Sequence, residues 1–220
     1  MRIDSHHSFT ERYPLDHLAS ILVRNRFEGS VLVGPAAWPV PDAPMVLAAI
    51  PPFDRSLMDA YLRHPKFYGV SHDLESGIPI GLEELERRGI PLDVAGGLSL
   101  IPEIARRFPA LRIVIDHLGT PSSDWARHLE FAAEFPQVYC KLSRVTRLMP
   151  SPRPYVQHAL AAFGPERLMF GSDWPACLPE ATWKASLAAF TQAIGAQTVE
   201  IREKLLGGTA ARFYGLDNRE

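Results

Sequence analysis

The stretch RIVIDHLG, residues 112–119, decides the kind of sheet that this chain builds. Ile113, Val114 and Ile115 put apolar side chains on both faces of one short strand, which suits a strand covered on both sides, as in a parallel sheet. Other short apolar runs, bounded by turn residues, have the same character. We predict eight strands, at residues 2–7, 29–35, 45–50, 67–73, 91–96, 112–119, 138–143 and 168–175.

Amphipathic segments between these runs predict helices, at residues 15–27, 98–108 and 122–135. Eight strands that alternate with helices predict an α/β fold closed into a (β/α)8 TIM-like barrel. Such barrels typically need about 250 residues, so a chain of 220 residues predicts a compact or distorted barrel with some helices short or missing. An open doubly wound parallel sheet is the alternative. The proline-rich segment near 35–44 is predicted to be a loop, and we expect one domain over residues 1–220.

The composition excludes several classes of partner. The formal net charge is −2, with acidic and basic residues mixed along the chain, which gives no electrostatic footprint for nucleic acid or an anionic membrane. No run approaches the roughly 20 apolar residues that span a bilayer, and the start, MRIDSHH, lacks the apolar core of a signal peptide. Cys140 and Cys177 do not make a disulfide framework. These features predict a cytoplasmic protein.

Ionisable and polar residues gather where the predicted strands end. In a β/α barrel the carboxyl ends of the strands form the mouth of the active-site pocket, so we expect these residues to share one pocket. They are His6, His7 and Ser8 after the first strand, Ser71, His72 and Asp73 in the fourth, Asp116 and His117 in the sixth, Lys141, Ser143 and Arg144 in the seventh, and Ser172, Asp173 and Trp174 in the eighth.

The alternation of side chains along a strand predicts which of them face the pocket. Adjacent residues point to opposite faces, so His6 and His7 cannot both line it, and we expect His7 to be structural. Ser8, at i+2 from His6, is expected to face the same cavity as His6. By the same rule, one of Asp116 and His117 is expected to point away.

With these residues assembled, the chain resembles the amidohydrolase superfamily, and within it the amidohydrolase-related branch that holds sugar-acid lactonases and the 2-pyrone-4,6-dicarboxylate lactonase. MRIDSHHSF resembles the opening strand with its H-x-H motif, and GVSHDL resembles a G-V-R-H segment. HLGTP, YCKLS and MFGSDWP follow in the order of that branch. Three positions depart from the pattern: Ser8 replaces the second histidine of H-x-H, Ser71 replaces the arginine of G-V-R-H, and Arg144 replaces a glycine after K-L-S.

The resemblance implies a site made of His6, His117 and Asp173, both as catalytic residues and as the ligands of one divalent metal ion, zinc or a similar cation. Some members of the branch work without metal, so metal-free chemistry stays open. Because Ser8 stands where a ligand is expected, the metal site is half retained; a hydroxyl is a poorer zinc ligand than imidazole, which binds at about 2.0–2.1 Å. Five further residues are expected to bind substrate: His72, Lys141, Ser143, Arg144 and Trp174.

The expected function is hydrolysis of a small carbonyl substrate, a lactone of a sugar acid or dicarboxylate. Asp173 would take a proton from the attacking water, and His117 and His6 would polarise the carbonyl oxygen. A metal-dependent non-oxidative decarboxylase and a non-catalytic ligand-binding barrel are the alternatives. We expect a carboxylate-bearing small-molecule substrate and neither a nucleic-acid nor a membrane partner, and a homo-oligomer stays open.

Overall fold

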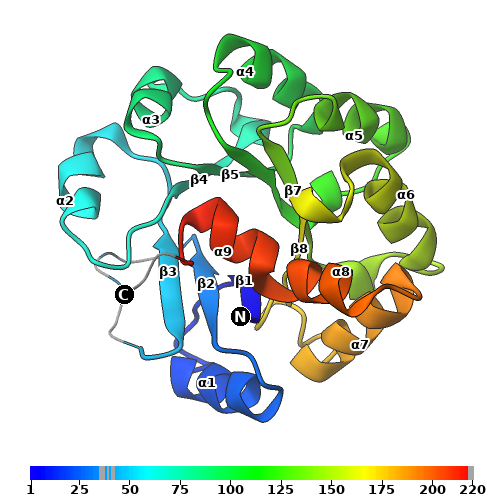
Figure 1. Ribbon diagram of the computed structural model, residues 1–220. Helices are drawn as coiled ribbons and strands as arrows, with labels where there is room; N and C mark the ends of the chain where they lie inside the picture. Colours follow the sequence, from blue (N-terminus) through cyan, green and yellow to red (C-terminus); the bar gives the residue numbers. More distant parts are fainter. Residues whose placement is uncertain (35–37, 39, 41–42, 218–220) are drawn as a thin grey trace.

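The structure is a computed structural model that describes residues 1–34, 38, 40 and 43–217. Within these residues, eight parallel strands surround the centre of the molecule in chain order (Figure 1). They are β1 (Ile3–His7), β2 (Gly29–Val33), β3 (Val46–Ile50), β4 (Val70–Asp73), β5 (Leu92–Ala95), β6 (Ile113–Ile115), β7 (Val138–Leu142) and β8 (Leu168–Phe170). Each predicted strand is confirmed, with shorter ends. Pro35, the last residue predicted for the second strand, lies outside the described residues.

Hydrogen bonds at two seams join the strands into a ring. Strands β1–β3 and β4–β8 form two regular sheets, and isolated parallel bridges connect them. At one seam Pro52 pairs with Ser71, and at the other His7 pairs with Trp174. The predicted barrel is therefore confirmed over the open doubly wound alternative.

Short helices cover the outside of the barrel in the described part of the chain (Figure 1). They are α1 (Leu15–Arg24), α2 (Met58–Leu62), α3 (Leu82–Arg88), α4 (Ile101–Arg107), α5 (Trp125–Ala133), α6 (Arg153–Phe163), α7 (Trp183–Ile194), α8 (Val199–Glu203) and α9 (Thr209–Tyr214). The three predicted helices are confirmed with trimmed ends. Between β2 and β3 the described residues contain no helix, which fits a compact barrel; most of the predicted loop near 35–44 lies outside them.

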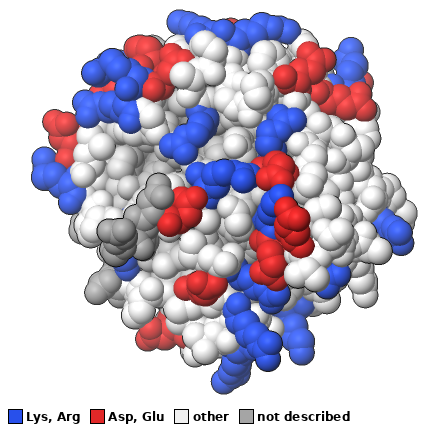
Figure 2. All heavy atoms as spheres, in the orientation of Figure 1, with Lys and Arg blue, Asp and Glu red and all other residues white. Residues whose placement is uncertain are grey.

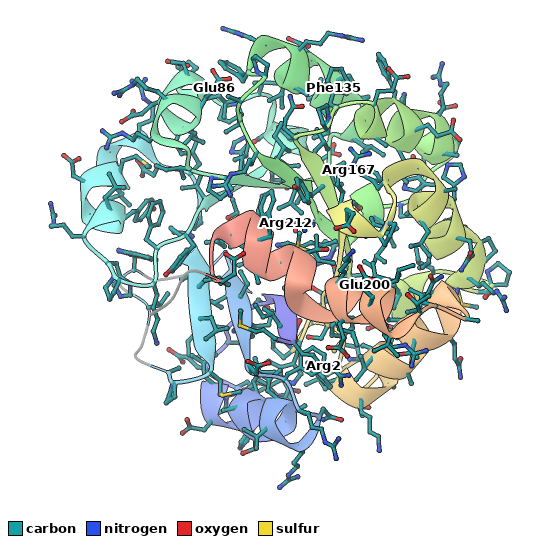
Figure 3. All side chains as sticks on the ribbon, in the orientation of Figure 1. Arg2, Glu86, Phe135, Arg167, Glu200 and Arg212 are labelled. Atoms are coloured by element: carbon teal, nitrogen blue, oxygen red, sulfur yellow. The ribbon has the colours of Figure 1, made fainter. Side chains whose placement is uncertain are left out.

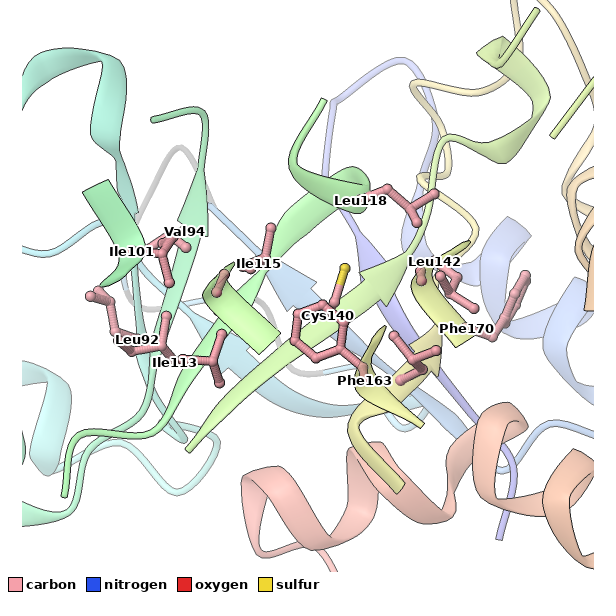
Figure 4. Close-up of a cluster of buried hydrophobic side chains, with 14 of the residues drawn as sticks. Leu92, Val94, Ile101, Ile113, Ile115, Leu118, Cys140, Leu142, Phe163 and Phe170 are labelled. Atoms are coloured by element: carbon pink, nitrogen blue, oxygen red, sulfur yellow. The ribbon is translucent and has the colours of Figure 1, made fainter. Parts of the chain in front are cut away.

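The main core lies between the strands and the outer helices. Apolar residues on the outward faces of β5–β8 pack against helix residues such as Ile101 and Phe163 (Figure 4). Cys140 belongs to this core, and burial raises the pKa of its thiol. Burial also raises the pKa of Cys177, to about 11. Both are free thiols held away from the thiolate form.

Helix α9 covers the end of the barrel at which the strands begin, and we call this end the floor (Figure 1). Phe213 and Tyr214 of α9 pack with Ile3, Val114 and Met169 in one buried cluster. The bend before α9 touches β1 so closely that a Cβ on Gly207 would lie 2.4 Å from the backbone nitrogen of Ile3. Side chains of the C-terminal helix thus help to fill the barrel interior.

Charged side chains are mixed on the floor face. Figure 2 shows basic and acidic residues interspersed there, without a large area of one sign. Figure 3 places Arg212 on α9, where its guanidinium contacts the Glu166 carboxylate at 3.1 Å. Over the described residues, every helix is too short or too polar to cross a membrane.

Asp4 joins three segments around β1. Its side chain is fully buried; Oδ1 accepts a hydrogen bond from the Ser172 backbone N–H (2.8 Å), and Oδ2 accepts one from Nε1 of Trp183 on α7 (2.7 Å). A buried carboxylate without these donors would be costly. These two hydrogen bonds, which we call the Asp4 clamp, hold β1, the segment after β8 and α7 together.

Replacing Trp183 by Phe removes one donor from this buried carboxylate. Hydrogen bonds to charged groups contribute about 1.5–3 kcal/mol, so we expect the free energy of unfolding, measured by urea denaturation, to fall by about that amount. Trp38→Phe is the matched control, because the Trp38 ring packs against Tyr61 and His64. Equal effects of the two changes would show that ring size, and not the hydrogen bond, explains the loss.

Candidate active site

A cavity of about 460 Å³ opens at the carboxyl ends of the strands. Its wall comes from β1 to β6, so segments distant in the sequence meet there, as expected for a barrel. The lining residues are His6, Val33, Pro52, Phe53, Ser71, His72, Asp73, Ser76, Ala95, Asp116 and His117.

A bulge in β1 sets the directions of the two adjacent histidines. Asp4 pairs with Ser30 and His7 with Leu32, so three steps on β1 oppose two on β2. His7 therefore lies on the outward side with Leu32, while His6 lines the cavity. His7 is fully buried, and burial, with His6 nearby, lowers its pKa to about 3. This placement agrees with the structural part predicted for His7.

The end of β6 overturns the prediction that Asp116 and His117 point to opposite sides. Both line the cavity. The strand ends at Ile115, and His117 has a left-handed backbone (φ 53°), so the alternation of a strand does not reach it. A left-handed non-glycine residue is strained and concentrates at functional sites. Here the left-handed backbone conformation directs the His117 side chain into the cavity beside Asp116.

His6, His117 and Asp173 converge, although Asp173 comes from the segment after β8. The rings of His6 and His117 have centroids 4.5 Å apart. Oδ1 of Asp173 lies 3.9 Å from Nε2 of His6 and 4.0 Å from Nε2 of His117. Asp173 also has a left-handed backbone (φ 59°). Its backbone N–H donates a hydrogen bond to the His6 carbonyl at 2.9 Å, which holds this conformation. Two imidazole nitrogens thus face one carboxylate oxygen.

Neighbouring polar groups orient both ends of this trio. Nε of Arg144 donates to Oδ2 of Asp173 at 2.8 Å, which leaves Oδ1 toward the histidines. Oγ of Ser143 lies 2.8 Å from Nδ1 of His117 and accepts the His117 backbone N–H at 3.1 Å. Asp173 is therefore held through Oδ2 and His117 through Nδ1, the side-chain atoms that point away from the other members of the trio.

Asp116 contacts His6 and a buried cation. Its Oδ1 lies 3.2 Å from Nδ1 of His6 and 3.0 Å from Nζ of Lys141. Nζ of Lys141 also donates to Oδ2 of Asp93 at 2.5 Å. Lys141 has no exposed surface. Its ammonium is enclosed beneath the cavity by two carboxylates, and the binding of substrate by Lys141 stays a prediction.

Burial and these neighbours shift the pKa values of the site. Burial alone would raise the pKa of Asp116, but Lys141 and His6 outweigh it and hold that pKa well below its usual range. Burial opposes the charge on Lys141, yet Asp116 and Asp93 raise the pKa of its ammonium. Burial, with His6 nearby, lowers the pKa of His117 well below 6.5. At pH 7 His117 is therefore neutral and keeps a lone pair.

Several other predicted residues are not part of the wall of the cavity that His6 lines: Ser8, Ser143, Arg144, Asp173 and Trp174. Ser8 lines a different cavity, of about 440 Å³, with Tyr13 and Pro175. Strand β1 ends at His7, so the rule that i and i+2 share a face does not extend to Ser8, whose N–H instead donates to the Trp174 carbonyl (2.8 Å). Ser143 and Trp174 are 1% and 2% exposed, and their contact with substrate stays a prediction. Among the predicted substrate-binding residues, His72 does line the cavity.

Two residues of the surrounding network were not predicted. Asp93 lies in the middle of β5 and is fully buried, and its Oδ2 accepts from the hydroxyl of Tyr214 at 2.7 Å. The signal for Asp93 was a lone acid between Leu92 and Val94 in an apolar strand, which requires a buried partner. Nothing in the sequence singled out Tyr214, because an aromatic residue in a terminal helix predicts a place in the hydrophobic core.

Comparison with known proteins gives one family. The sequence profile of the family described as Amidohydrolase matches residues 31–216. L-fucono-1,5-lactonase of Burkholderia multivorans is 35% identical over 134 residues, which are 50% of this chain and 45% of that protein. The chain spans about half the length of the curated relatives it matches.

Two solved structures extend the likeness over nearly the whole chain. An amidohydrolase from Burkholderia multivorans with bound zinc is 26% identical, with a TM-score of 0.83 over 98% of this chain and 99% of that one. A protein from Pseudomonas putida described as a putative 2-pyrone-4,6-dicarboxylic acid hydrolase is 25% identical, with a TM-score of 0.78 over 99% and 98% of the two chains. The barrel described above is thus a known architecture.

Gly171, directly after β8, leaves room for the site. A Cβ there would lie 2.7 Å from Cβ of His6 and 3.1 Å from Cβ of Ser143. We expect Gly171→Ala to lower the free energy of unfolding by about 1–3 kcal/mol, as overpacking does, and to displace His6. Urea denaturation measures the first effect and histidine NMR shifts the second. Gly208→Ala is the control, since its Cβ would meet its nearest neighbour at 3.5 Å; a Gly171→Ala protein as stable as the control would refute the tight contact.

Proposed function

The chain belongs to the amidohydrolase family, and from that premise we propose that it hydrolyses a small lactone at the cavity that His6 and His117 line. The observation that carries the proposal is the convergence of two imidazole nitrogens on Oδ1 of Asp173, at 3.9 and 4.0 Å. A general base must reach the proton that it abstracts directly or through one water. One water molecule can bridge polar groups at separations of this kind.

Asp173 is the proposed general base. Its side chain is 3% exposed, and Arg144 holds its other oxygen, so Oδ1 keeps one direction. Asp173 would take a proton from water as the water attacks the lactone carbonyl. The ring opens when the acyl carbon–oxygen bond breaks, and the same carboxyl returns the proton to the leaving alkoxide.

His117 is the proposed group that donates a hydrogen bond to the carbonyl oxygen and stabilises its charge. The lowered pKa of His117 keeps it neutral, and Ser143 fixes its ring. Asp116 fixes the ring of His6. Pre-oriented groups of this kind stabilise a developing oxyanion without having to reorganise.

The same residues fit one divalent cation. Donor atoms of His6, Asp116 and His117 lie within 4.8 Å of one another, and Asp173 adds the contacts near 4 Å. Oδ1 of Asp116 already contacts Lys141 and Nδ1 of His6, so we assign Asp116 to orienting His6 and assign the cation to His6, His117 and Asp173, which is three protein ligands, as in catalytic zinc sites. When bound, the cation supplies Lewis acidity toward water and the carbonyl oxygen. The zinc bound to the relative from Burkholderia multivorans supports the binding of a cation.

The lactones of the relatives suggest the substrate class. L-fucono-1,5-lactonase and the pyrone dicarboxylate hydrolase are named for lactones, and a cavity of about 460 Å³ accommodates a single sugar-sized ring. Arg144, whose side chain is 38% exposed, is the proposed contact for a substrate carboxylate, with His72 on the cavity wall. We take residues 1–220 as one domain that carries this activity.

Asp173→Asn tests the proposed base. Loss of a general base costs about 10²–10⁴-fold in rate, so we expect kcat for L-fucono-1,5-lactone, or for the best substrate of a lactone panel, to fall at least a hundredfold. Acid release at pH 7–8 measures the rate, and product analysis separates hydrolysis from decarboxylation, which would release carbon dioxide.

The matched control is Asp59→Asn, on helix α2 and away from the cavity. It should keep full activity, and urea denaturation should show that Asp173→Asn is still folded. An Asp173→Asn enzyme that hydrolyses at the wild-type rate would refute the assignment. Wild type that opens no lactone of the panel would favour the decarboxylase or the binding-only barrel.

Zinc titration by calorimetry tests the proposed ligands. We expect wild type to bind one equivalent, and His117→Asn to bind it more weakly by more than the roughly 10–100-fold that loss of an outer partner costs. His17→Asn, at an exposed position on α1, is the control. Ser8→His should not gain affinity, because Ser8 lines the other cavity; a clear gain would return Ser8 to the metal site.

A further inference from the structure

We propose that Lys141 is a positioning residue for His6, and that Tyr214 of the C-terminal helix holds Lys141 in place through Asp93. The proposal rests on the proposed function only for the chemical use of His6. Its geometry forms one chain of contacts from the floor of the barrel to the mouth: Tyr214, Asp93, Lys141, Asp116 and His6.

The position of Lys141 in the barrel interior is fixed by two carboxylates from neighbouring strands. Nζ lies 2.5 Å from Oδ2 of Asp93 and 3.0 Å from Oδ1 of Asp116. All three side chains are at most 4% exposed. An ion pair this deep is weak evidence for stability, because apolar residues of similar volume often replace such a pair without loss. A reason other than packing is therefore needed for a buried lysine beneath the site.

That reason is the arrangement of Asp116 and His6. Oδ1 of Asp116 lies 3.2 Å from Nδ1 of His6, and Nζ of Lys141 lies 3.4 Å from the same nitrogen. An ammonium group only donates hydrogen bonds. Two of the three donors of Lys141 face Asp93 and Asp116. Nδ1 of His6 lies nearer to the Asp116 oxygen (3.2 Å) than to Nζ (3.4 Å), so we assign the carboxylate as its partner and the proton of His6 to Nδ1. Nε2 of His6 then presents a lone pair toward Asp173, 3.9 Å away.

Tyr214 contacts Asp93, the carboxylate of this network that lies farthest from His6 along the chain of contacts. Its hydroxyl donates to the same Asp93 oxygen that accepts from Lys141, at 2.7 Å, and Nζ of Lys141 lies 5.7 Å from the centre of its ring. Tyr214 comes from α9, which crosses the floor (Figure 1). The hydroxyl shares the charge of Asp93, so Lys141 stays available to Asp116. Without it, Lys141 would be drawn toward Asp93 and away from Asp116.

The tautomer of His6 is the direct test. Protein labelled with ¹⁵N-histidine, without added metal, reports by long-range proton–nitrogen correlation which ring nitrogen of each histidine is protonated; His6→Asn assigns the His6 signals. We expect His6 of wild type to be protonated on Nδ1, and the population of this tautomer to fall in Lys141→Met and Tyr214→Phe. Zinc affinity should fall about tenfold in both, the lower end of the cost of losing an outer partner.

Tyr139→Phe is the matched control, because Tyr139 lies on the same strand as Lys141 and its ring packs against Phe213 of the same helix (4.8 Å). It should leave the His6 spectrum and zinc affinity unchanged. Wild-type His6 protonated on Nε2 would overturn the proposal, and so would wild-type His6 spectra in the variants. If Lys141→Met does not fold, Tyr214→Phe decides alone. A protein that opens no lactone but shows the predicted tautomer changes would refute the proposed function and leave this inference standing.

Discussion

The backbone amide of Asp173 donates to the carbonyl of His6 (2.9 Å), and the amide of Ser8 donates to the carbonyl of Trp174 (2.8 Å). These two hydrogen bonds join the first strand of the barrel to the segment after the last. An open sheet would leave the two chain segments at opposite edges, and Asp173 would not meet His6. Closure of the ring thus creates both the fold and the site, and the buried Asp4 clamp, which binds the same two segments to α7, keeps the seam closed.

The two carboxylates that contact the histidines, Asp116 and Asp173, pair with different basic side chains. Asp116 contacts Lys141 in the closed interior, while Asp173 contacts Arg144, which is partly open to solvent. Burial opposes the charge of Asp116, but the neighbouring ammonium helps to hold the pKa of its carboxyl well below its usual range. The two imidazoles lie between these ion pairs, where a cation or the carbonyl end of a substrate would meet them. The buried pair of Asp116 and Lys141 is suited to orienting His6. The pair of Asp173 and Arg144 is partly exposed through Arg144, so it is suited to contact with substrate.

A side chain from the floor of the barrel takes part in the hydrogen-bond network beneath the site. Helix α9 fills the interior with Phe213 and Tyr214, as a core helix does, but the Tyr214 hydroxyl also enters the polar chain below His6. A barrel interior is a packed core and not a pore, so a polar chain through it has to satisfy its donors and acceptors internally. In this way the geometry of a site at one end can depend on a helix at the other.

Apolar runs such as IVI at 113–115 and the turn residues around them were enough to determine the eight strands, their parallel order and the strand ends that carry His6, His117 and Asp173, because burial on both faces is written locally in the residue types. Three results needed the tertiary structure. The left-handed turn brings Asp116 and His117 to one side, the end of β1 at His7 turns Ser8 away, and the barrel interior encloses Lys141 between Asp93 and Asp116. Each depends on where a strand stops or on which strands face each other across the ring. A lysine at a strand end reads the same in sequence whether it points to solvent or to two buried carboxylates, and only the closed barrel distinguishes the two.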